Sequence, residues 1–154
     1  MKKFETNELY KKYSEDVFNY SISLLKDYDL AKDAVQDVFL KFIDSENHFR
    51  GDCSYKSWLL VITRNYCYGK LRIKRKDPAR LDDVTEIIEE NNFDENISIA
   101  DAIGKLNHED SEIIYLREYA GHSYKEMAEI LETSIDNVKV KLFRVRKKLR
   151  KYLR

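Results

Sequence analysis

The stretch that decides the fold is SYKEMAEILETSIDNVKVKL, residues 123–142. Two segments with apolar residues at helical spacing flank the polar residues at 132–134, a pattern typical of a helix-turn-helix. Ser123 and Glu126 stand three residues apart and predict a capping box at the start of the first helix. Ser134 is placed to cap the second helix. Such turns often use glycine for a left-handed residue, and this turn has none.

The second helix of this motif is strongly basic. Residues 139–154 include nine basic side chains and no acidic one. A helix of this kind is either a surface helix with a solvated charged face or one that enters the major groove of DNA. The agreement of turn, cap and charge favours DNA binding. The stripe predicted to be buried consists of Val138, Leu142, Val145, Leu149 and Tyr152.

Charge is segregated along a chain whose net charge is zero. Residues 64–80 carry seven basic and one acidic side chain, whereas residues 81–112 carry one basic and eleven acidic side chains. Two basic blocks therefore flank an acidic middle, which indicates two separate contacts with one polyanion. With only four glycines and one proline in 154 residues, helices are favoured over a turn-rich β fold.

Several classes of protein are disfavoured by what the sequence lacks. Cys53 and Cys67 are isolated thiols, and the three histidines do not have the spacing of metal ligands, so neither a metal nor a disulfide is expected. No glycine-rich phosphate loop or nucleophile with a partner base is present, so we expect no cofactor and no enzymatic activity. No apolar run approaches the roughly 20 residues of a membrane helix. The N-terminus lacks the apolar core of a signal peptide, so a cytoplasmic location is expected.

Helical periodicity predicts an all-α fold of two small domains. In the first, residues 5–78, one helix is predicted to be capped by Thr6 or Asn7, a second by Asp29, and a third to begin near Ser57. The core stripe of the second helix is predicted to be Ala34, Val35, Val38, Phe39, Phe42 and Ile43.

The second domain is predicted at residues 98–154, after an acidic linker at 79–97. Ser98 opens it, Asn107 caps its next helix, and Gly121 is a natural stop for the helix before the helix-turn-helix.

Three segments resemble bacterial sigma factors of the sigma-70 family, in its short extracytoplasmic-function (ECF) branch. DLAKDAVQDVFLKF, residues 29–42, resembles the polymerase-binding helix of that family. SWLLVITRN, residues 57–65, with the basic run after it, resembles the next helix. The chain from Leu106 onward resembles the family's C-terminal domain. The similarity covers nearly all of residues 7–153 in the family's order.

The resemblance implies that the chain binds core RNA polymerase and directs it to promoter DNA. The first domain would dock on polymerase and help to melt the −10 element, and the second would read the −35 element as a duplex. On the helix at 30–43, the side opposite the core stripe forms one row at spacings of three and four. The resemblance assigns this row to polymerase binding, and the alternative is an ordinary surface row. The row consists of Asp33, Gln36, Asp37, Leu40 and Lys41.

Aromatic and basic side chains over residues 49–75 suit the melting of the −10 element, because rings stack on bases and cations follow phosphates. Trp58 and Tyr66 are favoured as core residues instead, given their helical spacing. The residues expected to contact the −10 element are Phe49, Arg50, Tyr55, Arg64, Asn65, Lys70, Arg72, Lys74 and Arg75.

On the basic helix, Asn137 and Lys141 lie early enough to reach base edges. The family commonly has GTVKSR where this chain has DNVKVK, residues 136–141. Asp136 therefore either accepts a hydrogen bond from cytosine or caps the helix, and the cap is favoured. Phosphate contacts are expected from Arg144, Lys147 and Lys148. The residues assigned to the −35 element are Ser134, Asp136, Asn137, Lys139, Lys141, Arg144 and Lys148.

The resemblance also implies an anti-sigma factor as an antagonist. The acidic linker is either a solvated spacer or a segment that lies in the basic channel for nascent RNA. The competing function is a dimeric helix-turn-helix regulator of a palindrome, which would need neither the row on the helix at 30–43 nor the basic-aromatic segment. We expect the chain to be a monomer when free.

Overall fold

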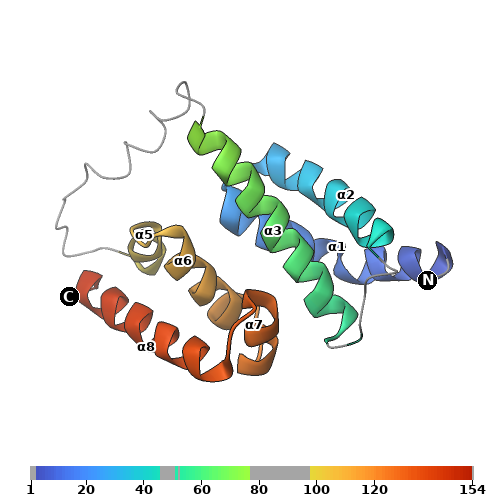
Figure 1. Cartoon of the computed structure of the whole chain (residues 1–154). Helices are drawn as coiled ribbons and strands as arrows, with labels where there is room; N and C mark the ends of the chain where they lie inside the picture. Colours follow the sequence, from blue (N-terminus) through green and yellow to red (C-terminus); the bar gives the residue numbers. More distant parts are fainter. Residues whose placement is uncertain (1–2, 46–50, 52, 77–97, 154) are drawn as a thin grey trace. The chain divides into compact units, whose positions relative to one another are not determined.

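The computed structural model describes residues 3–45, 51, 53–76 and 98–153, with only the backbone described for residues 3–5, 74–76, 99 and 100. These residues are mostly helical, with no strand among them, which confirms the predicted all-α fold (Figure 1). The chain divides into two compact units, the first comprising residues 1–71 and 129–132 and the second comprising residues 72–128 and 133–154, and each helix is assigned to the unit that contains most of its residues. The domain bounds predicted above stay predictions, and the whole predicted linker, residues 79–97, lies outside the described residues, as do residues 77 and 78.

The first unit contains α1 (Lys3–Leu25), α2 (Tyr28–Asp44) and α3 (Tyr55–Lys76). The predicted caps Thr6 and Asn7 are wrong, because α1 is already helical at Lys3 and both residues lie inside it. No helix in the part of the chain that the structure describes combines the length and the apolar character needed to span a membrane.

The junction between α1 and α2 corrects a second predicted cap. Lys26 takes a left-handed conformation with φ 54°, which ends α1 after Leu25. Asp27 is the residue that caps α2, since its Oδ1 accepts a hydrogen bond from the Leu30 N–H at 3.0 Å. Asp29, predicted to be the cap, lies in the first turn, where its negative charge still favours the helix N-terminus.

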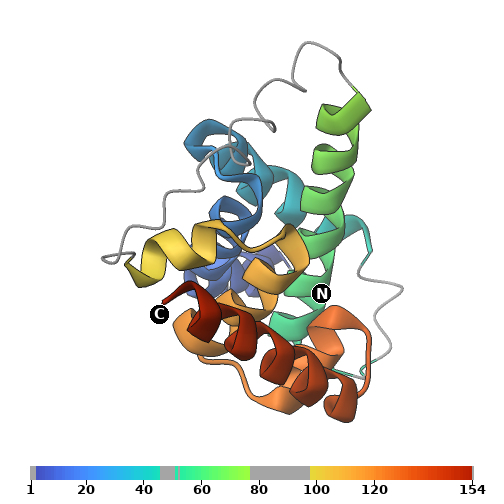
Figure 2. The same ribbon diagram turned by 90° about the vertical axis from the view of Figure 1, so that its left-hand side faces the viewer.

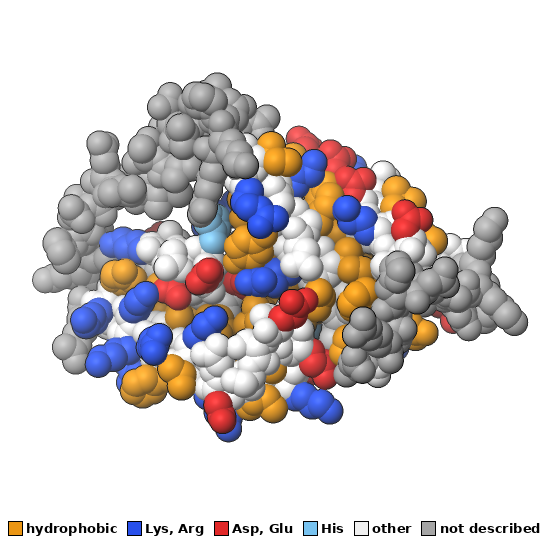
Figure 3. Space-filling model, viewed as in Figure 1, with side chains coloured by type: hydrophobic (Ala, Val, Ile, Leu, Met, Phe, Trp, Pro, Cys, Tyr) orange, Lys and Arg blue, Asp and Glu red, His pale blue; other side chains and the backbone are white. Residues whose placement is uncertain are grey.

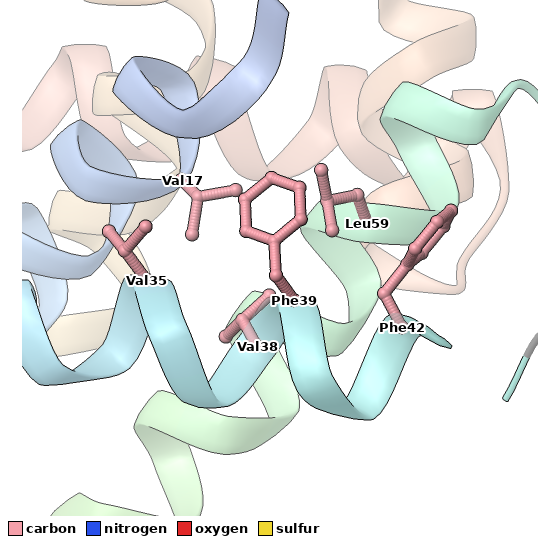
Figure 4. Packing of buried hydrophobic residues seen from close by; sticks show 6 residues of the cluster. All are labelled: Val17, Val35, Val38, Phe39, Phe42 and Leu59. Carbon is pink, nitrogen blue, oxygen red and sulfur yellow. The ribbon is translucent and has the colours of Figure 1, made fainter. Parts of the chain in front are cut away.

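The core of the first unit is the predicted stripe of α2. Phe39 points between Val17 of α1 and Leu59 of α3 (Figure 4). One end of the stripe was predicted wrongly, because Ile43 is 44% exposed. It follows Phe42 by one position, which turns its side chain about 100° away from the buried face. The buried cluster consists of Val17, Val35, Val38, Phe39, Phe42 and Leu59.

The start of α3 lies two residues earlier than predicted. The Ser54 hydroxyl accepts a hydrogen bond from the Ser57 N–H at 3.1 Å, so Ser54 satisfies a free donor of the first turn. Trp58 and Tyr66 are partly buried against the core cluster, as predicted. The buried Thr63 hydroxyl donates to the Leu59 carbonyl at 2.8 Å and so does not remain without a partner in the core.

The second unit contains α5 (Ile99–Gly104), α6 (His108–Ile114), a π-helical turn η3 (Tyr115–Tyr119), α7 (Tyr124–Leu131) and α8 (Ile135–Tyr152). α6 packs against α8 (Figure 2).

Three predicted helix boundaries of the second unit are confirmed. Ser98 and Asp101 form a capping box at the start of α5. Asn107 Oδ1 accepts from the Asp110 N–H at 2.8 Å at the start of α6. Gly121 has φ 73°, the left-handed conformation that suits a glycine after a helix.

The predicted helix-turn-helix is α7, residues 132–134 and α8. The Ser123 hydroxyl accepts from the Glu126 N–H at 3.1 Å, and the Glu126 carboxylate accepts from the Ser123 N–H at 3.1 Å. Burial alone would raise the pKa of Glu126, but the hydrogen bonds from Ser123 outweigh it and hold that pKa below its usual value. Ser134 caps α8 by accepting from the Asn137 N–H at 3.1 Å. Local sequence therefore determines both helix starts.

The turn without glycine is made by Glu132, which takes the left-handed conformation with φ 53°. A residue with a Cβ is strained there by about 1–2 kcal/mol. Glycine removes this strain but loses more conformational entropy on folding, so the net gain in stability is smaller. We expect Glu132→Gly to raise the free energy of unfolding by up to about 1 kcal/mol, measured by urea denaturation. Glu129→Gly is the matched control, because Glu129 lies inside α7, where glycine destabilises a helix. A loss of stability in Glu132→Gly would contradict the strained turn.

Candidate nucleic-acid and polymerase interface

The row predicted for polymerase binding lies on the exposed side of α2. Asp33, Gln36 and Lys41 are exposed, and Leu40 is 61% exposed. Ile43 follows Leu40 by three positions, so the structure adds a second exposed apolar side chain to this side of the helix.

Asp37 differs from the rest of the row because it is half-buried and bonded to α3. The Tyr66 hydroxyl donates to Asp37 Oδ2 at 2.6 Å. Burial raises the pKa of Tyr66, and the hydrogen bond and negative charge of Asp37 raise it further. The Lys70 ammonium lies 5.5 Å from the centre of the Tyr66 ring. Asp37, a residue of the row predicted to bind polymerase, is therefore hydrogen-bonded to α3, the helix predicted to contact the −10 element.

α3 presents the described part of the predicted −10 surface. Asn65, Lys70 and Arg72 are exposed, and Arg64 is half-buried with its guanidinium 4.7 Å from the centre of the Tyr68 ring. Tyr55 is exposed at the start of the helix.

The remaining −10 predictions lie outside what the structure describes. Phe49 and Arg50 belong to residues 46–50, and the side chains of Lys74 and Arg75 are not described, although α3 extends to Lys76.

α8 is attached to its unit by the apolar stripe that the sequence predicts. Val138, Leu142 and Val145 are buried, while Leu149 and Tyr152 are half-buried. Lys and Arg side chains gather over α8, with hydrophobic side chains among them (Figure 3).

The direction of each row on α8 follows from helical geometry, in which one residue corresponds to about 100°. Each residue of the predicted row stands one position before a residue of the buried stripe. The row therefore lies about 100° around the helix from the buried side, on the flank of α8. Its members are Asn137, Lys141, Arg144 and Lys148. A second row precedes the stripe by two positions, about 200°, and therefore lies opposite the buried side. The members of this second row, all exposed, are Asp136, Val140, Phe143 and Lys147.

Two cations of α8 form ion pairs within the second unit. Arg146 donates to Glu118 Oε1 at 2.6 Å, and this hydrogen bond raises the pKa of Arg146. Lys148 Nζ donates to Asp110 Oδ2 at 2.6 Å, which raises the pKa of Lys148. The structure thus brings Lys148, predicted to contact phosphate, to a carboxylate of α6.

The first turn of α8 also holds predicted contact residues in place. Asn137 Nδ2 donates to Thr133 Oγ1 at 2.6 Å, so its amide is oriented toward the turn. The favoured role of Asp136 as the cap is wrong, because Ser134 caps the helix and Asp136 is an exposed residue of the first turn. The Lys139 ammonium lies 5.8 Å from the centre of the Tyr124 ring.

Sequence reasoning missed Phe143 and Ile43 as surface residues. Both are apolar and stand next to residues of a buried stripe in the sequence. Only their angle around the helix axis, measured from that stripe, distinguishes them from core residues. That signal was available for Phe143, which lies about 140° from Val138 on the helix.

Comparisons with known protein families identify both units. Residues 9–77 match the family described as "Sigma-70 region 2", and residues 97–149 match "Sigma-70, region 4". The chain belongs to the sigma-70 family. It is a sigma factor of the ECF branch, and it directs promoter-specific transcription initiation.

Curated relatives of similar length agree with this assignment. RNA polymerase sigma factor YlaC of Bacillus subtilis (strain 168) is 27% identical over 154 residues, covering 94% of this chain and 89% of the relative. ECF RNA polymerase sigma factor SigM of the same organism is 28% identical over 157 residues, covering 94% and 92%.

Solved structures show the same fold. CnrH, solved in complex with the cytosolic domain of CnrY, has a TM-score of 0.73 and 24% identity and covers 99% of this chain and 89% of CnrH. RpoE from Bartonella quintana, solved with the anti-sigma factor NepR, has a TM-score of 0.71 and 23% identity, covering 97% and 96%.

Proposed function

We propose that this sigma factor docks on core RNA polymerase through the exposed side of α2, contacts the −10 element through α3, and reads the −35 element through α8. The observation that carries the proposal is the exposed side of α8, where Lys141, Arg144 and Lys147 are left accessible because the helix is attached to its unit by the buried stripe. A helix held in this way can enter a major groove.

The α2 part of the proposal rests on an exposed leucine between polar neighbours. An apolar side chain that is 61% exposed beside Gln36 and Lys41 suits a protein partner that can cover it. Leu40 is also a sharper probe than Asp37, because replacing Asp37 would remove its hydrogen bond with Tyr66 as well.

The α3 part rests on two pairs, each of a cation beside an aromatic ring, on different sides of one helix. Arg64 beside Tyr68 and Lys70 beside Tyr66 place positive charge next to aromatic faces, the combination that binds single-stranded nucleic acid.

The proposal includes the setting in which the chain works. It acts in the cytoplasm as a non-enzymatic initiation factor, is a monomer when free, and is held by an anti-sigma factor. CnrH and RpoE, which share its fold, are each solved with such a protein or with a cytosolic domain bound to them.

Reconstituted transcription tests the α2 interface. The chain is added to bacterial core polymerase on a library of promoter fragments, and initiation is measured against the concentration of the chain. We expect Leu40→Ala to raise the concentration needed for half-maximal initiation by about tenfold, because truncating a well-packed interface residue costs about 1–2 kcal/mol.

Lys32→Ala is the matched control for this experiment. Lys32 is exposed at the edge of the row, about 80° around α2 from Leu40, so its truncation should change initiation much less than that of Leu40. Equal activity of Leu40→Ala and Lys32→Ala would contradict docking through α2. Failure of every promoter fragment to support initiation, together with tight duplex binding by a homodimer, would favour a dimeric regulator instead.

A further inference from the structure

The second row of α8, which lies opposite the buried stripe, contains a pair of exposed apolar side chains, Val140 and Phe143. Contacts with phosphates do not explain an apolar pair at this place. Val140 is 47% exposed and Phe143 is 63% exposed. They stand three positions apart, so they are neighbours on one side of the helix.

The surroundings of this pair are cationic. The exposed side chains next to it in sequence are Lys139, Lys141 and Arg144, and Lys147 follows in the same row. A protein interface of ordinary composition is depleted of lysine at its centre. Apolar groups within a field of cations instead fit a partner that is a polyanion with apolar points on its surface.

The major groove of DNA is such a partner. Phosphates line its edges, and on its floor each thymine presents a C5-methyl group that apolar side chains contact. The flank of α8 carries cations that can meet the phosphates, and the side opposite the buried stripe faces the floor. Val140 lies in the second turn of α8, within the N-terminal part of a recognition helix that reaches base edges.

We propose that Val140 and Phe143 contact thymine methyl groups, so that the −35 element of this sigma factor has thymines, on either strand, at the positions that face them. This inference rests on the proposed function of α8 as the −35 reader. It assigns part of the sequence preference to apolar contacts rather than to hydrogen bonds from the basic row.

Uracil substitution tests the proposal directly. A promoter is first selected by transcription with the full chain and core polymerase, from duplexes randomised over the −35 element. Each thymine of that element is then replaced by uracil, which keeps the base pair and removes only the methyl group. Competition binding of the polymerase complex should weaken about three- to fivefold at one or two positions, the effect of losing one buried methyl group.

Two variants assign each methyl group to its side chain. In Val140→Ala and Phe143→Ala, the uracil effect at the corresponding position should fall below about 1.5-fold, since the contact is already absent. Leu153→Ala is the matched control, because Leu153 is also exposed but lies at the end of α8. Its uracil profile should equal that of the unchanged chain. Both positions are exposed, so alanine is expected to leave the fold intact, and circular dichroism of each variant checks this.

Three results would overturn the inference. The first is a selected −35 element without thymine. The second is an element in which uracil has no effect at any thymine position. The third is a set of uracil effects that persists in both variants. If Phe143→Ala converts a dimer into a monomer without changing DNA binding, the apolar pair is a contact between copies of this chain. Absence of chain-dependent initiation would instead defeat the proposed function itself, which the first step of the experiment reveals separately.

Discussion

Replacing Arg144 with alanine is expected to weaken promoter binding by the polymerase complex about 10- to 100-fold. A hydrogen bond from a charged donor contributes about 1.5–3 kcal/mol, which corresponds to this range of affinity. Arg144 is exposed on α8, and its guanidinium forms no hydrogen bond or ion pair among the described residues. The measurement is competition binding to a promoter fragment at several salt concentrations. The salt slope should fall by about one, as expected for the loss of one phosphate contact.

Lys148→Ala is the matched control on the same helix. Lys148 lies one turn further along the same flank, but its ammonium is already 2.6 Å from Asp110 Oδ2. Contact with a phosphate would require Lys148 to give up this pair, so we expect Lys148→Ala to weaken binding less than about threefold. Asp110→Asn should release Lys148 and strengthen binding. Equal losses in Arg144→Ala and Lys148→Ala would show that the ion pair does not limit Lys148.

The boundaries of the second unit could be predicted because they depend on neighbouring residues. Ser123 with Glu126 and Ser134 with Asn137 are pairs three positions apart, and each hydrogen bond forms within one helical turn. The buried stripes of α2 and α8 follow from the spacing of apolar residues, which is also a local property. The wrong cap of α2 is a local error, because Asp27 and Asp29 were both able to cap the helix and the structure uses Asp27.

The partners of the candidate contact residues could not be predicted in the same way. Lys148 and Asp110 are 38 residues apart, and Tyr66 and Asp37 are 29 residues apart. Each pair forms only because packing brings two helices together, and spacing along the chain carries no sign of it. The sequence identified the basic helix and its buried stripe, but it did not show which cations of α8 would pair with carboxylates elsewhere in the unit.

The hydrogen bond between Tyr66 and Asp37 leads to a second large effect. We expect Tyr66→Phe to lower the free energy of unfolding by about 1.5–3 kcal/mol, the range for a hydrogen bond to a charged group. The ring stays in place, so its packing against the core cluster is retained. Urea denaturation at neutral pH measures the change. Tyr10→Phe is the matched control, because the Tyr10 ring also packs against the core, edge-on to Phe39, and its hydroxyl forms no hydrogen bond among the described residues.

The pH dependence of this difference separates the hydrogen bond from general packing. The pKa of Tyr66 is raised in the folded protein, so folding favours the protonated hydroxyl. The stabilisation is therefore fully present below the unfolded-state pKa of about 10 and is lost as the pH rises through the folded-state value. The stability gap between the unchanged chain and Tyr66→Phe should be constant from pH 7 to about 9 and shrink above about 10. The rest of the chain is identical in the two proteins, so its contribution to the pH dependence cancels in the difference.

The same substitution also tests whether the bond serves polymerase docking. Asp37 lies at the edge of the row on α2, and its carboxylate is oriented by Tyr66. If docking uses this orientation, Tyr66→Phe should raise the concentration of the chain needed for half-maximal initiation even at temperatures where it is fully folded. Asp37→Asn keeps an acceptor for the Tyr66 hydroxyl but removes the charge. A docking defect in Asp37→Asn with none in Tyr66→Phe would show that polymerase recognises the charge and not its position. A defect in both would show that α3 holds a polymerase contact in place.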